Sequence, residues 1–309
     1  MSPSVSSNAP PPDLGSMRPE EQAEWRTRLY GNEGFDERQR ADAKRIIGVA
    51  TGDSWFDYLP ARLAPHGDIL DCLNQRKEFN ILRTSVAGDT VENMIWGTGF
   101  WSDSWGPRDT RQLPQALQYV HDHDAAFFLF SGGGDDIAGP PLTDYLNHVG
   151  SGAPPLRQAQ LDNLINNYLA AGYQQMITAV RATKSGIPIF LHGYDYPVAD
   201  GRGVVNGPWG FHYIGPWLRP AFAMKRIDQT DMVTTLQALI DALNGMLARL
   251  HNPSAGIFHI DLRGLLQKYL YGPGPDGYQK AWANELHPTN PGFDLFADQF
   301  AAAILKTRA

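Results

Sequence analysis

The chain has 309 residues, of which 42% are hydrophobic, and it carries a formal net charge of −7. This balance allows a sizeable core and argues against binding nucleic acid through a basic surface. The single cysteine, Cys72, excludes an intramolecular disulfide and a cysteine-based zinc site, and no apolar run has the length of a membrane span. The beginning of the chain lacks the pattern of a secretory signal, so we expect a cytoplasmic location.

The N-terminal segment differs in composition from the rest. Residues 1–19 are rich in serine and proline and have little to bury, which predicts a disordered or surface-draped arm. Residues 20–30 are typical of a short helix that ends at Gly31. We expect residues 20–309 to form a single domain.

Apolar runs and helical patterns alternate along the remaining chain. Five apolar runs are typical of buried strands: 45–50, 79–85, 125–131, 187–193 and 256–261. Six segments have helical patterns: 56–77, 89–97, 110–123, 158–184, 229–251 and 293–306. Continuous apolar strands separated by helices predict an α/β fold, a three-layer α/β/α sandwich with a five-stranded parallel sheet.

Two long connections are rich in glycine, proline and aromatic residues. They span 97–109 and 194–220, and both follow a predicted strand or its helix, where open α/β sheets form their ligand crevice. Most of their aromatic residues would anchor the loops, but several together predict an apolar pocket or stacking platforms for a sugar ring. The candidate substrate-binding residues are Trp55, Trp101, Trp105, Tyr194, Trp209 and Trp217.

Ser54 follows the first apolar run, in the sequence Gly52-Asp53-Ser54, before a helix-like stretch. A serine at such a turn is an N-cap or a nucleophile held beside backbone N–H groups. Similar blocks follow the next two runs, Ala87-Gly88-Asp89 and Gly133-Gly134-Asp135-Asp136. A fourth block, Asn284-Glu285-Leu286-His287, precedes the last predicted helix.

In this order the four blocks resemble those of the SGNH, or GDSL-type, hydrolase family, over about residues 45–305. The resemblance implies a flavodoxin-like topology and ester hydrolysis through an acyl-serine, with no metal or organic cofactor. It implies that Ser54 is the nucleophile and His287 the general base. It also implies that the backbone N–H groups of Ser54 and Gly88 bind the oxyanion.

The sequence departs from the family pattern at two positions. Asp135 stands where the family has an oxyanion-binding asparagine, and Asn284 stands where it has the acid that orients the histidine. An ionised Asp135 would repel the oxyanion, so we expect it to be protonated or turned away. Three partners remain open for His287: Asn284 or a backbone carbonyl, which we favour slightly, Glu285 as a substitute acid, or a distant carboxylate such as Asp53.

Other patterns have ordinary explanations. The glycines at 132–134 lack the spacing of a nucleotide-binding loop, and the run His121-Asp122-His123-Asp124 is typical of a solvated helix end. His192, Asp195 and His212 lie in or near a crevice loop. A contact with substrate and a purely structural role are equally expected for them.

We expect a small-molecule or glycan ester as substrate, with no nucleic acid, and the sequence gives no oligomeric state. Two alternatives remain: a catalytically impaired binding module for a glycan or lipid-like ligand, and an acyltransferase that uses the same residues.

Overall fold

The computed structural model describes residues 32–58, 67–97, 111–206 and 212–308. The predicted arm 1–19 and the predicted helix 20–30 lie outside these ranges. So does almost all of loop 97–109, with Trp101 and Trp105, and so does Trp209 of loop 194–220.

A five-stranded parallel sheet lies at the centre of the fold, and its strand order is β2-β1-β3-β4-β7. The strands are β1 Ile46–Thr51, β2 Phe79–Arg83, β3 Phe127–Ser131, β4 Ile189–His192 and β7 Ile257–Ile260. Every residue of β2, β3 and β4 is buried, as is typical of parallel strands covered on both faces, and this includes the polar Asn80 and Arg83 of β2. The predicted fold class is therefore confirmed, and each predicted strand lies within one or two residues of the observed one.

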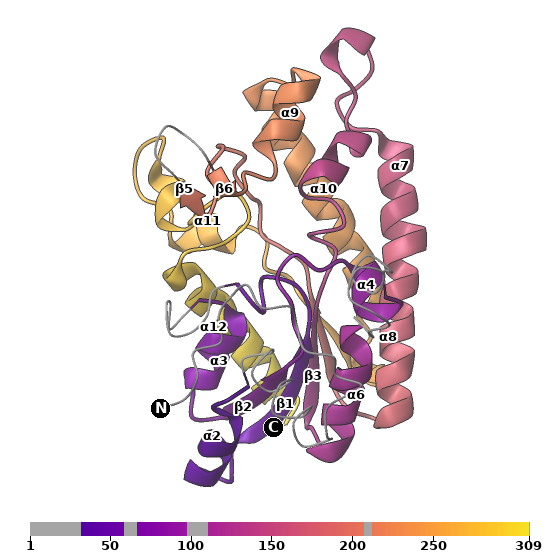
Figure 1. Cartoon of the computed structure of the whole chain (residues 1–309), viewed down its shortest axis with the longest axis vertical. Helices are drawn as coiled ribbons and strands as arrows, with labels where there is room; N and C mark the ends of the chain where they lie inside the picture. The colour runs from indigo at the N-terminus through magenta and orange to yellow at the C-terminus, as the bar shows by residue number, and fades with distance from the viewer. Residues whose placement is uncertain (1–31, 59–66, 98–110, 207–211, 309) are drawn as a thin grey trace, which may run out of the picture.

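Helices cover both faces of the sheet. Figure 1 shows α3 (Ile69–Gln75) and α12 (Asn290–Lys306) on one side, and α6 (Gln112–Asp122) and α8 (Ala170–Thr183) on the other. The short α4 (Val91–Ile95) packs on α6 and α8, and the long α10 (Gln229–Leu250) packs on β4 and β7.

The sequence misplaces or misses several shorter elements. Within the predicted helix 56–77, residues 56–58 belong to a turn and α3 begins at Ile69, where the Asp68 side chain accepts a hydrogen bond from the Asp71 N–H; residues 59–66 lie outside the described ranges. The predicted helix 158–184 consists of α7 (Gln158–Asn163), a π-helical turn (Leu164–Leu169) and α8. The elements not predicted are α2 Phe35–Ala41, α9 Arg219–Lys225, α11 Leu265–Tyr269, the ribbon of β5 Val205–Asn206 with β6 His212–Ile214, and the 3₁₀ turns Pro140–Tyr145, Val149–Ser151, Pro253–Ala255 and Gly277–Lys280. Segments of two to seven residues are too short to show a hydrophobic period.

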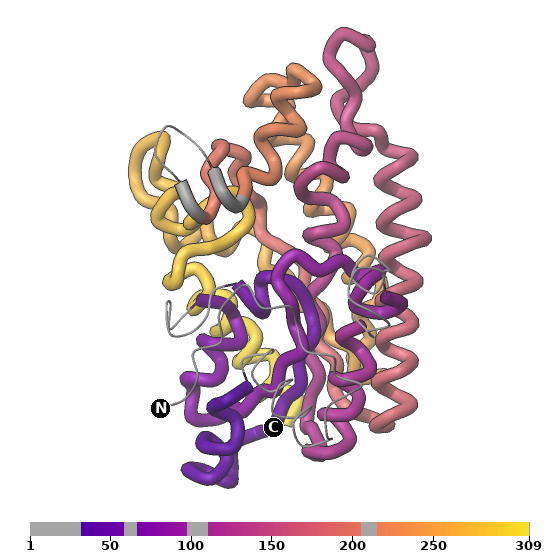
Figure 2. Tube along the Cα trace, in the orientation of Figure 1, coloured from indigo at the N-terminus to yellow at the C-terminus, as the bar shows by residue number. Residues whose placement is uncertain are grey.

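The N-terminal and C-terminal parts of the described chain pack against each other. Figure 2 shows the indigo-to-purple N-terminal part beside the yellow C-terminal part, and α12 packs on α3. The loop before α12 therefore lies next to the turn after β1, although 233 positions separate Ser54 from His287. Among the helices of the described ranges, none is long and apolar enough to cross a membrane.

Candidate active site

Ser54 lies in a tight turn directly after β1, at the carboxyl end of the sheet. The Phe56 and Asp57 N–H groups donate to the Asp53 and Ser54 carbonyls, so a turn and not a helix follows the serine. A Cβ atom at Gly52 would lie 2.6 Å from the Ser131 Cβ, so only glycine lets the ends of β1 and β3 approach this closely. The Ser54 hydroxyl is thereby fixed at the edge where the neighbouring strands also end.

His287 contacts Ser54 directly. The Nε2 atom of His287 lies 2.8 Å from the Ser54 Oγ, and its Nδ1 atom lies 3.0 Å from the Asn284 Oδ1. The Leu286 and His287 N–H groups also donate to Oδ1, at 3.0 and 2.9 Å, which identifies that atom as the amide oxygen. Nδ1 must then carry the proton, which leaves the Nε2 lone pair to accept from the serine hydroxyl.

The surroundings of His287 favour its neutral form. The side chain is only 4% exposed, and burial lowers its pKa to about 3. The ring of Tyr58 stacks on it, with centroids 3.8 Å apart and planes 9° from parallel. The Tyr58 hydroxyl accepts a hydrogen bond from the Asn284 Nδ2 at 2.8 Å, and the Trp217 ring meets His287 edge-on at 5.5 Å. At neutral pH the imidazole is therefore uncharged and able to take a proton.

The two carboxylates considered as partners of His287 are bonded elsewhere. The Glu285 carboxylate accepts four backbone N–H groups, those of Gly201, Trp217, Leu218 and Arg219, at 2.6–3.0 Å. Glu285 therefore holds loop 194–220 to the C-terminal block and does not act as a substitute acid. Asp53 accepts hydrogen bonds from the Ser131 hydroxyl at 2.7 Å, from the Tyr194 hydroxyl and from the Trp55 N–H. Neither Glu285 nor Asp53 replaces Asn284 as the partner of Nδ1.

The proposed oxyanion donors have free N–H groups. Within the described ranges, the Ser54 and Gly88 N–H groups donate to no acceptor. The loop that carries Gly88 is tied to the serine turn by the Val86 N–H on the Gly52 carbonyl and the Ala87 N–H on the Asp57 carboxylate. Gly88 has a φ of +82°, which is easily reached only by glycine. Both N–H groups can therefore serve a ligand oxygen.

Asp135 lies in a crowded group of acids. Its half-buried side chain lines the same cavity as Ser54, and no hydrogen bond to its carboxyl group comes from the described part of the chain. Burial and the neighbouring carboxylates of Asp53, Asp136 and Asp89 raise the pKa of Asp135 well above its usual value. Burial also raises the pKa of Asp136 to about 7, although its carboxylate accepts the Val91 N–H at 3.0 Å. Because no cation among the described residues compensates Asp135, its protonated form is favoured.

A cavity opens beside Ser54 and encloses about 650 Å³ with its mouth included. One wall is α10, whose leucine and isoleucine side chains recur at helical spacing along one face. The residues that line the cavity are Asp53, Ser54, Trp55, Gly133, Gly134, Asp135, Ile137, Ala138, Tyr194, Asp195, Pro197, Leu218, Leu236, Leu239, Ile240, Leu243, Trp282 and Leu286. The cavity is therefore mostly apolar, with its few polar groups near the serine.

The predicted aromatic residues have different positions. Trp55 and Tyr194 line the cavity, but Trp55 is 3% exposed and its Nε1 donates to the Leu286 carbonyl, so it is mainly a core residue. Tyr194 donates its hydroxyl to Asp53 and accepts from the Gly134 N–H. Trp217 contacts His287 instead of lining the cavity. The remaining three, Trp101, Trp105 and Trp209, lie outside the described residues.

Two of the loop residues weighed from the sequence serve the scaffold. His192 is buried among the rings of Trp55 and Phe56, and its Nδ1 contacts the Gly193 carbonyl. Asp195 borders the cavity, but its carboxylate accepts backbone N–H groups of Tyr196, Gly264 and Leu266. His212 begins β6. His121 and Asp122 pair with each other at the exposed end of α6, and no cluster in the described ranges has a metal-binding arrangement.

The sequence reasoning missed two parts of the site. Tyr58 lies four positions after Ser54, and no local pattern indicated that its ring would cover His287. The cavity wall on α10 was visible as a hydrophobic stripe within the predicted helix 229–251, but the stripe alone cannot distinguish a cavity from a packed core.

The comparisons with known proteins give structural similarity only. No protein-family profile matches the sequence, and no curated relative matches it. A carbohydrate esterase of family 3 from Talaromyces cellulolyticus has a TM-score of 0.42 at 11% identity, over 85% of this chain and 97% of that one. An extracellular lipase from Streptomyces rimosus has a TM-score of 0.47 at 13% identity, over 84% and 99%. A candidate SGNH hydrolase from Slackia heliotrinireducens has a TM-score of 0.45 at 13% identity, over 84% and 98%.

Identities this low do not transfer an activity, and TM-scores below 0.5 describe a loose similarity of fold.

Proposed function

We propose that this protein is a carboxylic-ester hydrolase that acts through an acyl-serine intermediate on Ser54. The observation that carries the proposal is the contact chain from the Ser54 Oγ to the His287 Nε2 and from the His287 Nδ1 to the Asn284 Oδ1. This series of contacts supplies a nucleophile, a base with a free lone pair and a group that fixes the tautomer of the base.

The reaction follows from these positions. The Ser54 Oγ attacks the ester carbon while its proton passes to the His287 Nε2, and the carbonyl π electrons move onto the oxygen. The C–O bond to the alcohol then breaks, and His287 returns its proton to the leaving alkoxide. A water molecule, deprotonated by the same imidazole, attacks the acyl-serine and releases the acid and the serine hydroxyl.

Neutral groups would stabilise both charges that develop, the oxyanion and the imidazolium. The Ser54 and Gly88 N–H groups bind the oxyanion, and a protonated Asp135 adds an O–H donor where the family has an amide. On the other side, the imidazolium is stabilised by the Asn284 Oδ1 and by the face of the Tyr58 ring, a contact of about 0.5–2 kcal/mol for a cation on an aromatic face. This site would therefore work with a Ser-His-Asn arrangement.

Labelling and turnover with matched serine variants test the proposal. The protein is treated with a fluorophosphonate, digested and analysed by mass spectrometry, and hydrolysis of p-nitrophenyl butyrate is measured in parallel. We expect the label on Ser54, and both label and turnover should disappear in Ser54→Ala. The control is Ser151→Ala, which removes the hydroxyl of an exposed serine that donates to the His148 carbonyl. Equal turnover in wild type and Ser54→Ala would refute the proposal.

A further inference from the structure

The cavity beside Ser54 has the properties of a chain-binding site. Leu236, Leu239 and Leu243 of α10 line it and are at most 4% exposed, and half-buried Ile240 lies on the same helix face. Apolar residues from three other segments also line it: Ile137, Ala138, Pro197, Leu218 and Leu286. A ligand group in this space would be surrounded by hydrocarbon.

The polar groups of the cavity are already used. The Tyr194 hydroxyl donates to Asp53, and the Asp195 carboxylate accepts three backbone N–H groups. Among the side chains that the structure describes around the cavity, only Ser54 and Asp135 have polar atoms free to meet a substrate, and both belong to the reacting centre. A sugar would leave its hydroxyl groups without partners deeper in the cavity, at a cost of about 1–3 kcal/mol each.

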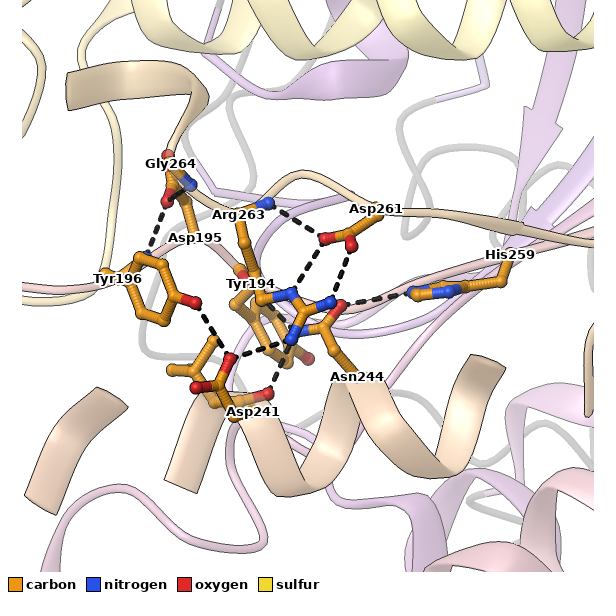
Figure 3. A network of polar contacts seen from close by, with 10 residues as sticks. Tyr194, Asp195, Tyr196, Asp241, Asn244, His259, Asp261, Arg263 and Gly264 are labelled. Carbon is orange, nitrogen blue, oxygen red and sulfur yellow. Dashed lines mark hydrogen bonds and ion pairs between the residues drawn. The ribbon is translucent and has the colours of Figure 1, made fainter. Parts of the chain in front are cut away.

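The wall formed by α10 is held from behind. The Asn244 Nδ2 donates to the Ile240 carbonyl of the same helix. Figure 3 shows the polar network around it: the Asn244 Oδ1 accepts from the His259 Nε2 at 3.1 Å, and Asp241 binds Arg263 at 2.7 Å and the Tyr196 hydroxyl at 2.8 Å. A Cβ atom at Gly193 would lie 2.4 Å from the Asn244 Oδ1, so the helix approaches the end of β4 closely. The stripe of leucines therefore faces the cavity on a fixed helix.

The length of the stripe limits the ligand. Leu243 lies beside the glycine loop at the reacting centre, since a Cβ atom at Gly133 would be 3.2 Å from its Cδ1. Leu236 lies seven residues earlier, which is about 10 Å along the helix. An extended alkyl chain with C–C bonds of about 1.5 Å advances about 1.3 Å per carbon. The stripe therefore matches about eight carbons.

From these observations we infer that the cavity binds the acyl part of the substrate and that this part is an unbranched alkyl chain of about eight carbons. The inference rests on the proposed ester hydrolysis, because it assigns the acyl side of that reaction to the cavity along α10. It predicts a medium-chain ester in place of an acetylated sugar or an aryl ester. The alcohol part lies outside the cavity.

Chain-length dependence is the first test. We would measure kcat/KM for p-nitrophenyl esters from acetyl to dodecanoyl, below their critical micelle concentrations. Each added methylene should increase kcat/KM by up to about fourfold, the value for full burial of one CH₂. The increase should stop near octanoyl. A profile that is flat, or that is highest for acetyl or benzoyl esters, would overturn the inference.

Substitutions at the far end of the stripe make the test specific. Leu236→Trp should lower kcat/KM for the octanoyl ester by about 15- to 60-fold, the contribution of two to three methylenes, and leave the acetyl ester nearly unchanged. Leu236→Ala should move the acyl length with the highest kcat/KM to longer chains. This variant provides the test if Leu236→Trp does not fold. Val233→Trp introduces the same ring on the exposed face of the same helix and should change neither ester. Equal losses for both esters in Leu236→Trp, or no shift in Leu236→Ala, would refute the assignment.

A binding measurement separates the two proposals. Calorimetry with Ser54→Ala should detect octanamide and not acetamide, and Leu236→Trp in that background should abolish the binding. Binding of octanamide together with a wild type that hydrolyses no ester would support the chain site and refute ester hydrolysis. Hydrolysis without chain dependence, and without octanamide binding, would leave the hydrolase and refute the chain site.

Discussion

The neutral partner of His287 makes Asn284→Asp the most informative substitution. An aspartate has the same shape, and its first oxygen can accept the Leu286 and His287 N–H groups and the Nδ1 proton as Asn284 Oδ1 does. Its second oxygen would face the Tyr58 hydroxyl, which now accepts from the Asn284 Nδ2 and can instead donate. The substitution therefore adds a charge and leaves every hydrogen bond possible.

The added charge should change the acid–base behaviour of His287. Burial holds its pKa at about 3 with no carboxylate in contact. A carboxylate in hydrogen-bond contact raises such a pKa by about 1–3 units, which is about 1–4 kcal/mol in favour of the imidazolium. Because the same imidazolium forms in the transition state, we expect kcat to increase by about 10- to 100-fold at pH 7. We also expect the acid limb of kcat/KM to move upward, to between about pH 4 and 6.

The assay is the pH dependence of kcat/KM with p-nitrophenyl butyrate for wild type, Asn284→Asp and Asn284→Ala. Asn284→Ala removes the acceptor and should lower kcat without raising the acid limb. Far-UV circular dichroism at each pH separates titration from unfolding, which is needed because burial also lowers the pKa of His192 to about 4. Both histidines bind protons more weakly when folded, so their contribution to stability is present above about pH 6.5 and is lost as the pH falls toward 3–4. An acid limb at the same pH in wild type and Asn284→Asp would refute the reasoning.

Three further predictions concern the acids of the site. Asp135→Asn should remove the alkaline limb of kcat/KM. An amide donates a hydrogen bond at every pH, whereas a carboxyl group with a raised pKa stops donating when it ionises. An unchanged pH profile would place Asp135 outside the oxyanion site. Asp136→Asn should raise the free energy of unfolding in urea by about 2–4 kcal/mol at pH 8 and little at pH 4. The pKa of Asp136 is raised to about 7 in the folded protein, so its contribution to stability is present below about pH 4 and is lost as the pH rises through 7. An equal effect at both pH values would contradict this. Glu285→Gln should lower the free energy of unfolding by several kcal/mol at pH 7. The new NH₂ group would face two of the four backbone N–H donors, at a cost of about 1–3 kcal/mol each. No change in the urea midpoint would contradict the assigned contacts.

The parts of the fold that sequence reasoning predicted are those set by local patterns. Most residues of β1, β2 and β3 are apolar and buried, so these runs stand out in the sequence, although Asn80 and Arg83 of β2 are buried polar residues. The helix predicted from residue 56 failed because the turn after Ser54 is fixed by contacts from distant segments. The Trp55 indole donates to Leu286, and the Phe56 carbonyl accepts from Arg83 and Ser85.

The roles of the site residues depend on contacts that no local pattern records. The sequence leaves Glu285 open as one of three partners for His287, two positions away, but the four groups that donate to its carboxylate lie 66–84 positions earlier in the chain. Asn284 could be weighed as the partner of His287 because the two are three positions apart in one turn. Its amide orientation is known only because two backbone N–H groups converge on Oδ1.

The two departures from the family pattern can be understood as one change in charge. With a carboxylate at 284 and an amide at 135, the transition state of ester attack would carry a carboxylate, an imidazolium and an oxyanion, for a net charge of −1. With Asn284 and a protonated Asp135, the same transition state is a neutral ion pair. Asp53, Asp89 and Asp136 already lie around this centre and contribute to the raised pKa of Asp135. A further carboxylate on His287 would support the imidazolium, and a site with fewer negative charges would favour the oxyanion. Exchanging the two residues therefore weakens the stabilisation of the imidazolium and removes one negative charge from the neighbourhood of the oxyanion.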